Sequence, residues 1–154
     1  MAQRAHILDQ LVATCFGIGY CPVASGTAAS IAGMGLIYAL LPYPTLYLPV
    51  LIGLLVLGTV TAGRLARAID AKDPGIVVID EVVGLMIAMI GIPWTWPNVI
   101  CGFFLFRALD MFKIYPINKF EALPGGVGIM LDDVMAGLYT NVILNVAMVV
   151  AINL

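Results

Sequence analysis

Long apolar stretches separated by two polar segments set the pattern of this chain. No charged residue occurs between Asp9 and Arg64. This interval is too long for a single membrane-spanning helix, which needs about 20 residues, and prolines divide it near its middle. The pattern predicts four to five transmembrane helices, with apolar segments at residues 28–41, 46–63, 82–92, 98–111 and 134–152.

The segment 14–27 differs from the apolar helix that we expect after it. It is rich in Gly, Pro, Ser and Thr, a composition that does not suit a lipid-facing helix. Irregular backbone at membrane depth needs protein or a water-filled cavity around it, so we expect a re-entrant or interfacial loop here. The preceding residues do not resemble a cleavable signal, because Asp9 interrupts the approach to the apolar stretch.

Composition indicates that the surrounding medium is lipid. Of 154 residues, 62% are hydrophobic and 10% are charged, whereas soluble domains average about 25% charged residues. The net charge of −2 also argues against a nucleic-acid-binding protein, which would carry clustered Lys and Arg. The fold class that follows is an all-α, polytopic integral membrane helical bundle that forms a single domain over residues 1–154.

The three cysteines give no sign of a covalent or metal-binding framework. Cys15, Cys21 and Cys101 are odd in number and show no CxxC spacing. Free cysteines commonly act as small apolar residues in protein interiors. We therefore expect these thiols to be buried.

Positive charges indicate which way the bundle faces. If the polar segment 64–81 is cytoplasmic, the turns at 42–45 and 93–97 lie outside and the second polar segment, 113–133, is again inside. The outer turns hold no Lys or Arg, and the inner segments hold five such residues: Arg64, Arg67, Lys72, Lys113 and Lys119. This distribution follows the positive-inside rule and predicts a cytoplasmic N terminus.

This topology gathers acidic residues at the cytoplasmic ends of three apolar segments. Five carboxylates lie there: Asp80, Glu81, Asp110, Asp132 and Asp133. A carboxylate beside membrane-embedded sequence is costly unless it has a partner. Oxygen ligands suit Mg²⁺, which uses a few carboxylates and leaves positions for water and a phosphate. We therefore expect all five carboxylates to form a catalytic Mg²⁺ site.

Two purely structural roles compete with this interpretation. An Asp at a helix start commonly caps free backbone N–H groups, and Arg107 could simply neutralise Asp110, three residues away. The convergence of three acidic clusters at one depth favours a functional role. Gly84 and Gly137 each follow an acidic residue by four positions, and such small residues let membrane helices pack closely.

Nearby basic and glycine residues suggest that this site binds a phosphate. Arg107 offers paired hydrogen bonds to phosphate and Lys113 a point charge. Gly26 and Thr27 belong to a turn that precedes a predicted helix, where backbone N–H groups can bind an anion, with a simple capping turn as the alternative. The single histidine, His6, excludes a lipid phosphatase that uses two histidines. Metal-assisted phosphoryl chemistry at the membrane surface remains.

Four short motifs follow one another along most of the chain. They are Pro22-x-x-Ser25-Gly26-Thr27-x-x-Ser30, Asp80-Glu81-x-x-Gly84, Phe106-Arg107-x-x-Asp110-x-x-Lys113-x-x-Pro116-Ile117 and Gly125-Gly126-x-Gly128-Ile129-Met130-x-Asp132-Asp133-x-x-Ala136-Gly137. Together they resemble the motifs of the phosphatidylglycerophosphatase A family of bacterial membrane enzymes. Three positions depart from the pattern of that family: Ser25, Ala29 and Ile114.

The resemblance implies Mg²⁺-dependent hydrolysis of the lipid phosphatidylglycerophosphate to phosphatidylglycerol and phosphate. It implies a multi-pass protein of the bacterial inner membrane whose active site faces the cytoplasm. Two mechanisms stay open, direct attack of water and attack of a carboxylate that forms an acyl phosphate. The alternative functions are a phosphatase of another phospholipid or of an isoprenoid phosphate, and a non-enzymatic subunit of a divalent-cation channel or transporter. The last of these should carry carboxylates across the membrane midplane, whereas those found here lie near one edge.

Overall fold

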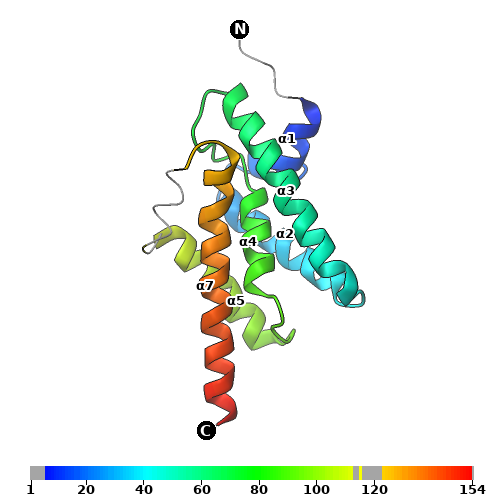
Figure 1. Cartoon of the computed structure of the whole chain (residues 1–154), viewed down its shortest axis with the longest axis vertical. Helices are drawn as coiled ribbons and strands as arrows, with labels where there is room; N and C mark the ends of the chain where they lie inside the picture. Colours follow the sequence, from blue (N-terminus) through cyan, green and yellow to red (C-terminus); the bar gives the residue numbers. More distant parts are fainter. Residues whose placement is uncertain (1–5, 113–114, 116–122, 154) are drawn as a thin grey trace.

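Helices make up the regular structure of this chain. The computed structural model describes residues 6–112, 115 and 123–153, without the side chain of Ile152. These residues form six α-helices and one 3-10 helix, with no β-strand among them (Figure 1). The all-α fold class is therefore confirmed for this part of the chain. In order, the elements are α1 (Ile7–Ala13), η1 (Ile18–Tyr20), α2 (Ser25–Leu40), α3 (Pro44–Ala68), α4 (Ile79–Ala88), α5 (Trp96–Phe112) and α7 (Gly126–Ile152).

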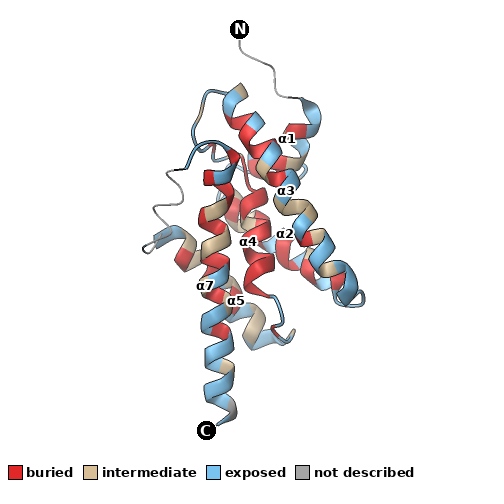
Figure 2. Cartoon of the chain, viewed as in Figure 1, coloured by how far each residue is buried: buried red, intermediate tan, exposed pale blue. Residues whose placement is uncertain are grey.

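The helix α4 is buried along nearly its whole length at the centre of the bundle. It packs against α2, α3, α5 and α7, and Figure 2 shows almost all of its ribbon in the colour of buried residues. Val83, Leu85 and Met86 have no exposed surface. Because a helix that is apolar on all sides belongs in an interior, this sequence draws the acidic first turn of α4 into the protein.

Glycine residues let α7 cross α4 and α3 at backbone contact. A Cβ atom on Gly137 would collide with the carbonyl of Gly84, and one on Gly126 would collide with the carbonyl of Thr59. Small residues permit such close helix packing. The predicted packing role of Gly84 and Gly137 is confirmed, and the crossing brings Asp133 next to the first turn of α4.

Two helix boundaries differ from the predicted segments. The helix α7 begins at Gly126, well before residue 134, so Asp132 and Asp133 lie inside a helix and not at its start. This glycine-rich stretch is helical because its backbone packs directly on α3, where a side chain would not fit. The helix α4 ends at Ala88 and has 10 residues, a length of roughly 15 Å that is too short to cross a bilayer by itself.

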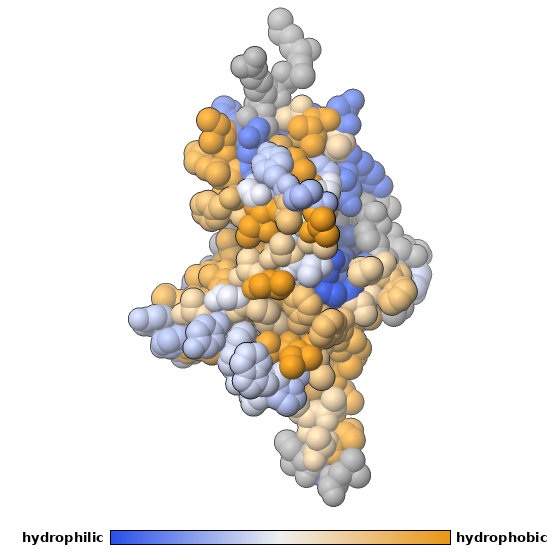
Figure 3. All heavy atoms as spheres, turned by 180° about the vertical axis from the view of Figure 1, so that it is seen from behind, coloured by the Kyte–Doolittle hydropathy of each residue, from blue (hydrophilic) through white to orange (hydrophobic). Residues whose placement is uncertain are grey.

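Among the residues that the structure describes, two helices are long and apolar enough to cross a membrane. They are α3, with 25 residues, and the stretch Gly126–Ala151 of α7, with 26 residues. Figure 3 shows hydrophobic residues over much of one face, and the exposed side chains of these helices include many Leu, Ile and Val. An apolar surface of this kind fits association with a membrane. The number of four to five spans and the re-entrant loop stay predictions.

The helix α1 lies outside every predicted element and has its charged residue on the inside. The Asp9 carboxylate is buried and lies 3.5 Å from Nη1 of Arg64 on α3. Ile7 and Leu8, by contrast, are exposed on the outer side. Apolar residues outside and a paired charge inside are typical of a segment that contacts lipid.

Two of the three cysteines are exposed, so the prediction of buried thiols is wrong for Cys21 and Cys101. Cys101 lies on an exposed side of α5, where an apolar thiol can contact lipid. The Cys21 thiol donates a hydrogen bond to the carbonyl of Val23 at 3.4 Å. Cys15 is partly buried, and burial raises the pKa of its thiol to about 12.

Candidate active site

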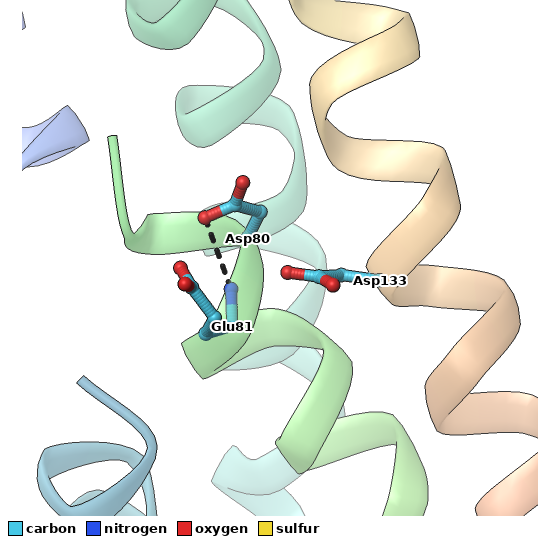
Figure 4. Close-up of side chains that lie close together, drawn as sticks. All are labelled: Asp80, Glu81 and Asp133. Carbon is cyan, nitrogen blue, oxygen red and sulfur yellow. Dashed lines mark hydrogen bonds between the residues drawn. The ribbon is translucent and has the colours of Figure 1, made fainter. Parts of the chain in front are cut away.

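Three carboxylates from two helices lie close together, where the start of α4 packs against α7 (Figure 4). Asp80 and Glu81 come from the first turn of α4, and Asp133 comes from α7. One oxygen atom from each residue lies within 4.8 Å of the corresponding atoms of the other two. The three side chains are therefore within reach of a single cation.

Backbone hydrogen bonds orient the first residue of each acidic pair, Asp80-Glu81 and Asp132-Asp133, in the same way. Oδ1 of Asp80 accepts the backbone N–H of Glu81 at 3.1 Å, and Oδ1 of Asp132 accepts that of Asp133 at 3.1 Å. The N-cap of α4 is Val78, and Asp133 lies well inside α7. The alternative interpretation as a helix cap is therefore wrong for Asp133, whereas Asp80 accepts one of the free N–H groups in the first turn of α4 without being its N-cap.

Two carboxylate oxygens in this cluster are buried without a hydrogen-bond partner among the described residues. They are Oε2 of Glu81 and Oδ1 of Asp133, and Asp133 is only 3% exposed. Burying a charged group without a partner is unfavourable. A bound cation would remove that cost, and the all-oxygen donor set suits a hard cation such as Mg²⁺.

Burial raises the pKa of the Asp80 and Glu81 carboxyls, which precede the predicted span 82–92. Desolvation is the largest cause at both residues. Repulsion from Glu81 raises the pKa of Asp80 further, whereas the positive charge of Arg107 acts in the opposite direction at Glu81. A divalent cation would favour the charged forms and so reverse these shifts.

Arg107 on α5 links two of the acidic groups. Its Nη1 atom lies 2.8 Å from Oδ2 of Asp110 and 3.9 Å from Oε1 of Glu81. The pairing with Asp110 that the sequence offers as a structural alternative is present, and the guanidinium also reaches the cluster on α4. Because a guanidinium carries five N–H donors, this pairing leaves donors for a phosphate oxygen.

The start of α2 packs directly against these charged groups. A Cβ atom on Gly26 would collide with Oε1 of Glu81 and would lie 3.1 Å from both terminal nitrogens of Arg107. The Ser25 hydroxyl donates to the carbonyl of Gly75 at 3.2 Å, which connects the start of α2 to the segment that leads into α4. A larger residue at position 26 would therefore displace the ends of the Glu81 and Arg107 side chains.

A cavity of about 380 Å³ joins these groups. Arg107 and Gly26 line it, together with all five predicted carboxylates: Asp80, Glu81, Asp110, Asp132 and Asp133. Asp110 and Asp132 thus border the cavity, although they lie outside the cluster of three. Thr27 does not line the cavity, and Lys113 lies outside the residues that the structure describes.

The four sequence motifs and this geometry agree with a comparison against known families. The family model for phosphatidylglycerophosphatase A matches residues 11–148. The chain belongs to the phosphatidylglycerophosphatase A family. It is therefore a phosphatase.

Individual relatives support this membership in the phosphatidylglycerophosphatase A family. The chain is 37% identical to phosphatidylglycerophosphatase A of Escherichia coli, covering 82% of this chain and 76% of the relative. It is 35% identical to the enzyme of the same name in Haemophilus influenzae, covering 86% of this chain and 84% of the relative. A third relative, from Bacteroides thetaiotaomicron, is 38% identical, covering 94% of this chain and 96% of the relative. Its name proposes a phosphatidylinositol-3-phosphatase. No solved structure matches the chain.

In this member of the phosphatidylglycerophosphatase A family, residues from all four motifs line one cavity. They come from the start of α2, the start of α4, the end of α5 and the second turn of α7. The sequence analysis missed Asp73, which also lines the cavity. The turn residues Pro74 and Gly75, which directly follow Asp73, are the signal that could have drawn attention to it.

Proposed function

We propose that this phosphatase removes the terminal phosphate of phosphatidylglycerophosphate in a Mg²⁺-dependent reaction at the cytoplasmic surface of the bacterial inner membrane. The observation that carries the proposal is the cluster of Asp80, Glu81 and Asp133, in which two buried oxygens, one on Glu81 and one on Asp133, lack hydrogen-bond partners among the described residues. Arg107 beside this cluster supplies the positive charge that a phosphate needs. The names of the Escherichia coli and Haemophilus influenzae relatives support this substrate.

Each group at the cavity has a distinct role in this proposal. Asp80, Glu81 and Asp133 would hold Mg²⁺, which when bound neutralises negative charge on the phosphate. Arg107 would orient the phosphate through hydrogen bonds, and Asp110 would fix the guanidinium by its 2.8 Å contact. Gly26 would let the start of α2 approach the phosphate closely.

Three further residues of the predicted site remain part of the proposal. Asp132 borders the cavity, where its carboxylate can accept a proton during the reaction. Lys113 and Thr27 would add a positive charge and a donor to the phosphate-binding side, as the family motifs suggest.

The nucleophile is either water or one of the site carboxylates. Attack by a carboxylate would form an acyl phosphate that water then hydrolyses. Acid quenching during turnover of a substrate radiolabelled in its terminal phosphate distinguishes the two routes. Phosphate recovered covalently on an Asp or Glu of the protein supports the acyl phosphate, and its absence during turnover supports direct attack by water.

A second candidate substrate is phosphatidylinositol 3-phosphate, because the name of the Bacteroides thetaiotaomicron relative proposes that activity. Both lipids carry a phosphate monoester. The site charges described above fit either headgroup, so the substrate has to be determined by measurement.

A substrate panel with purified protein in detergent micelles tests the proposal. Phosphate release would be measured from phosphatidylglycerophosphate, phosphatidylinositol 3-phosphate and an isoprenoid phosphate, each with Mg²⁺ or with excess EDTA. We expect the highest kcat/KM with phosphatidylglycerophosphate and release only with Mg²⁺. Faster phosphate release from another lipid of the panel would show that this lipid, and not phosphatidylglycerophosphate, is the preferred substrate. Uptake of a divalent cation into liposomes without any phosphate release would support the channel alternative.

A further inference from the structure

A second cavity, also of about 380 Å³, lies beside the acidic site and is almost entirely apolar. Its walls come from α1, the segment between α1 and α2, α2, α3 and the first turn of α4; they include Cys15, Phe16, Leu36, Leu57, Ile79 and Val82. Its volume falls within the roughly 300–1,000 Å³ of ordinary ligand pockets. None of the predicted site residues that the structure describes lines it.

The two cavities share their walls. In the first turn of α4, Asp80 and Glu81 line the acidic cavity, whereas Ile79 and Val82 line the apolar one. The segment between α1 and α2 likewise contributes to both, with residues 15, 16 and 18 on the apolar side and residues 21, 22 and 24 on the acidic side. The same two segments therefore separate the acidic cavity from the apolar cavity.

The apolar cavity extends away from the charged end of the bundle. Gly26 lines the acidic cavity at the start of α2, and Leu36 lines the apolar cavity on the same helix. At 1.5 Å per residue these positions are about 15 Å apart along the helix axis. In the proposed orientation this direction leads from the cytoplasmic surface towards the bilayer interior, the direction in which a lipid chain runs.

The rim of the apolar cavity has a strained backbone and an exposed aromatic ring. Cys15 and Phe16 have φ angles of 48° and 56°, in the left-handed region that residues other than glycine rarely adopt. Phe16 is 86% exposed although it borders the cavity. Strained backbone concentrates where a ligand is held, and an exposed aromatic side chain suits contact with an apolar ligand.

We propose that this cavity binds one acyl chain of the phospholipid whose phosphate is hydrolysed in the acidic cavity. The inference rests on the proposed function, because it joins a lipid tail to the headgroup that the acidic cavity holds. A larger apolar cavity of about 640 Å³ lies between α5 and α7 and shares no lining residue with the acidic site. It therefore serves as the control position and not as an alternative chain site.

A pair of matched substitutions tests the acyl-chain site. Ala32→Phe fills the apolar cavity and Ala147→Phe fills the control cavity, since these alanines line one cavity each. Phosphate release would be measured with long-chain phosphatidylglycerophosphate and with a soluble short-chain analogue. We expect Ala32→Phe to raise KM for the long-chain lipid by about tenfold and to leave the analogue unaffected. Ala147→Phe should change neither KM.

The outcomes separate this inference from the proposed function. Release by the wild type from neither substrate would overturn both. Release by the wild type, with an equal effect of Ala32→Phe on the two substrates, would overturn only the acyl-chain site. Crosslinking of the unmodified protein by a phospholipid with a diazirine at its chain end gives a second test that needs no variant. Label around Phe16 and Leu36, displaced by unlabelled substrate, supports the site, and label spread evenly over the outer faces of the helices contradicts it.

Discussion

At the scale of single residues, the site depends on an absent side chain as much as on charged ones. Gly26 leaves the space that Oε1 of Glu81 and the guanidinium of Arg107 occupy. A methyl group there would push apart the groups that we assign to metal and phosphate. Small displacements of positioned groups lower reaction rates strongly, so this glycine is as important to the site as its carboxylates.

The substitution Gly26→Ala should therefore reduce phosphate release by about 100-fold or more. Gly35→Ala is its control on the same helix, because a Cβ atom at position 35 would meet nothing within 4 Å. The control should keep full activity and gain about 0.5–1 kcal/mol of unfolding free energy, the usual effect of replacing a mid-helix glycine with alanine. Phosphate release and thermal unfolding of both variants measure these effects. Full activity of Gly26→Ala would contradict the assigned geometry.

Protons and Mg²⁺ should compensate for each other at Asp80 and Glu81. The pKa of both carboxyls is higher in the folded protein than in the unfolded chain. In EDTA, unfolding free energy should therefore be highest near the ordinary carboxyl pKa of about 4 and should fall as pH rises through the raised values. Since a cation needs the charged forms, the stabilisation by Mg²⁺ should grow over the same range.

Thermal unfolding in detergent from about pH 4 to about pH 8, with Mg²⁺ or with EDTA, measures this compensation. The difference in Tm between the two conditions should be small at the acid end and large near neutral pH. An equal difference throughout would show that these carboxylates are not the Mg²⁺ ligands.

At the scale of elements, α4 is a short helix whose C-terminal end, like its N-terminal end, is buried among the other helices. Its last carbonyls have no partner within the helix and need donors from elsewhere. The Tyr47 hydroxyl donates to the carbonyl of Met86 at 2.7 Å, and Nδ2 of Asn141 donates to those of Ala88 and Ile90 at 3.0 and 2.8 Å. Side chains of α3 and α7 thus fix the helix that carries Asp80.

Replacing Asn141 with leucine should destabilise the protein by about 1–3 kcal/mol for each carbonyl left unpaired. Asn153→Leu is the control, because Nδ2 of Asn153 donates to the Val149 carbonyl of its own helix. Unfolding of both variants in mixed detergent micelles gives the comparison. Equal stability of the two would show that the end of α4 needs no capping by α7.

Local patterns predicted the elements well where hydrophobicity alone decides them. The apolar segments 28–41, 46–63 and 98–111 each lie largely within one helix, and all five predicted carboxylates line one cavity. The early start of α7 was missed because glycines usually indicate a loop, whereas Gly126 is helical owing to its contact with Thr59 of α3. Such contacts depend on a partner helix that is distant in sequence. For the same reason the position of Gly26 against Glu81 could not be predicted.

At the scale of the whole molecule, two native cysteines can report the proposed orientation. Cys21 is exposed and lines the acidic cavity, and Cys101 is exposed on α5. A membrane-impermeant maleimide should label Cys21 in inside-out vesicles but not in right-side-out vesicles. Cys101 should stay unlabelled in both, because the bilayer would cover it. The high pKa of Cys15, about 12, keeps its thiol largely unreactive.

A Cys21→Ser variant controls for this labelling, since it should lose the signal in inside-out vesicles. Labelling of Cys21 only in right-side-out vesicles would place the acidic cavity on the outer surface and reverse the proposed topology.

The most direct test of the metal-dependent phosphatase site is phosphate release by Asp133→Asn. This change keeps the size of a buried side chain and removes a charge from the three-carboxylate cluster. Asp70→Asn is the control, because Asp70 is exposed and its φ of 54° is one that asparagine tolerates. Release from phosphatidylglycerophosphate in detergent micelles should require Mg²⁺ and should fall at least about 100-fold in Asp133→Asn, with Asp70→Asn unchanged. Full activity of Asp133→Asn, or undiminished release in excess EDTA, would contradict a metal-dependent site at the three-carboxylate cluster.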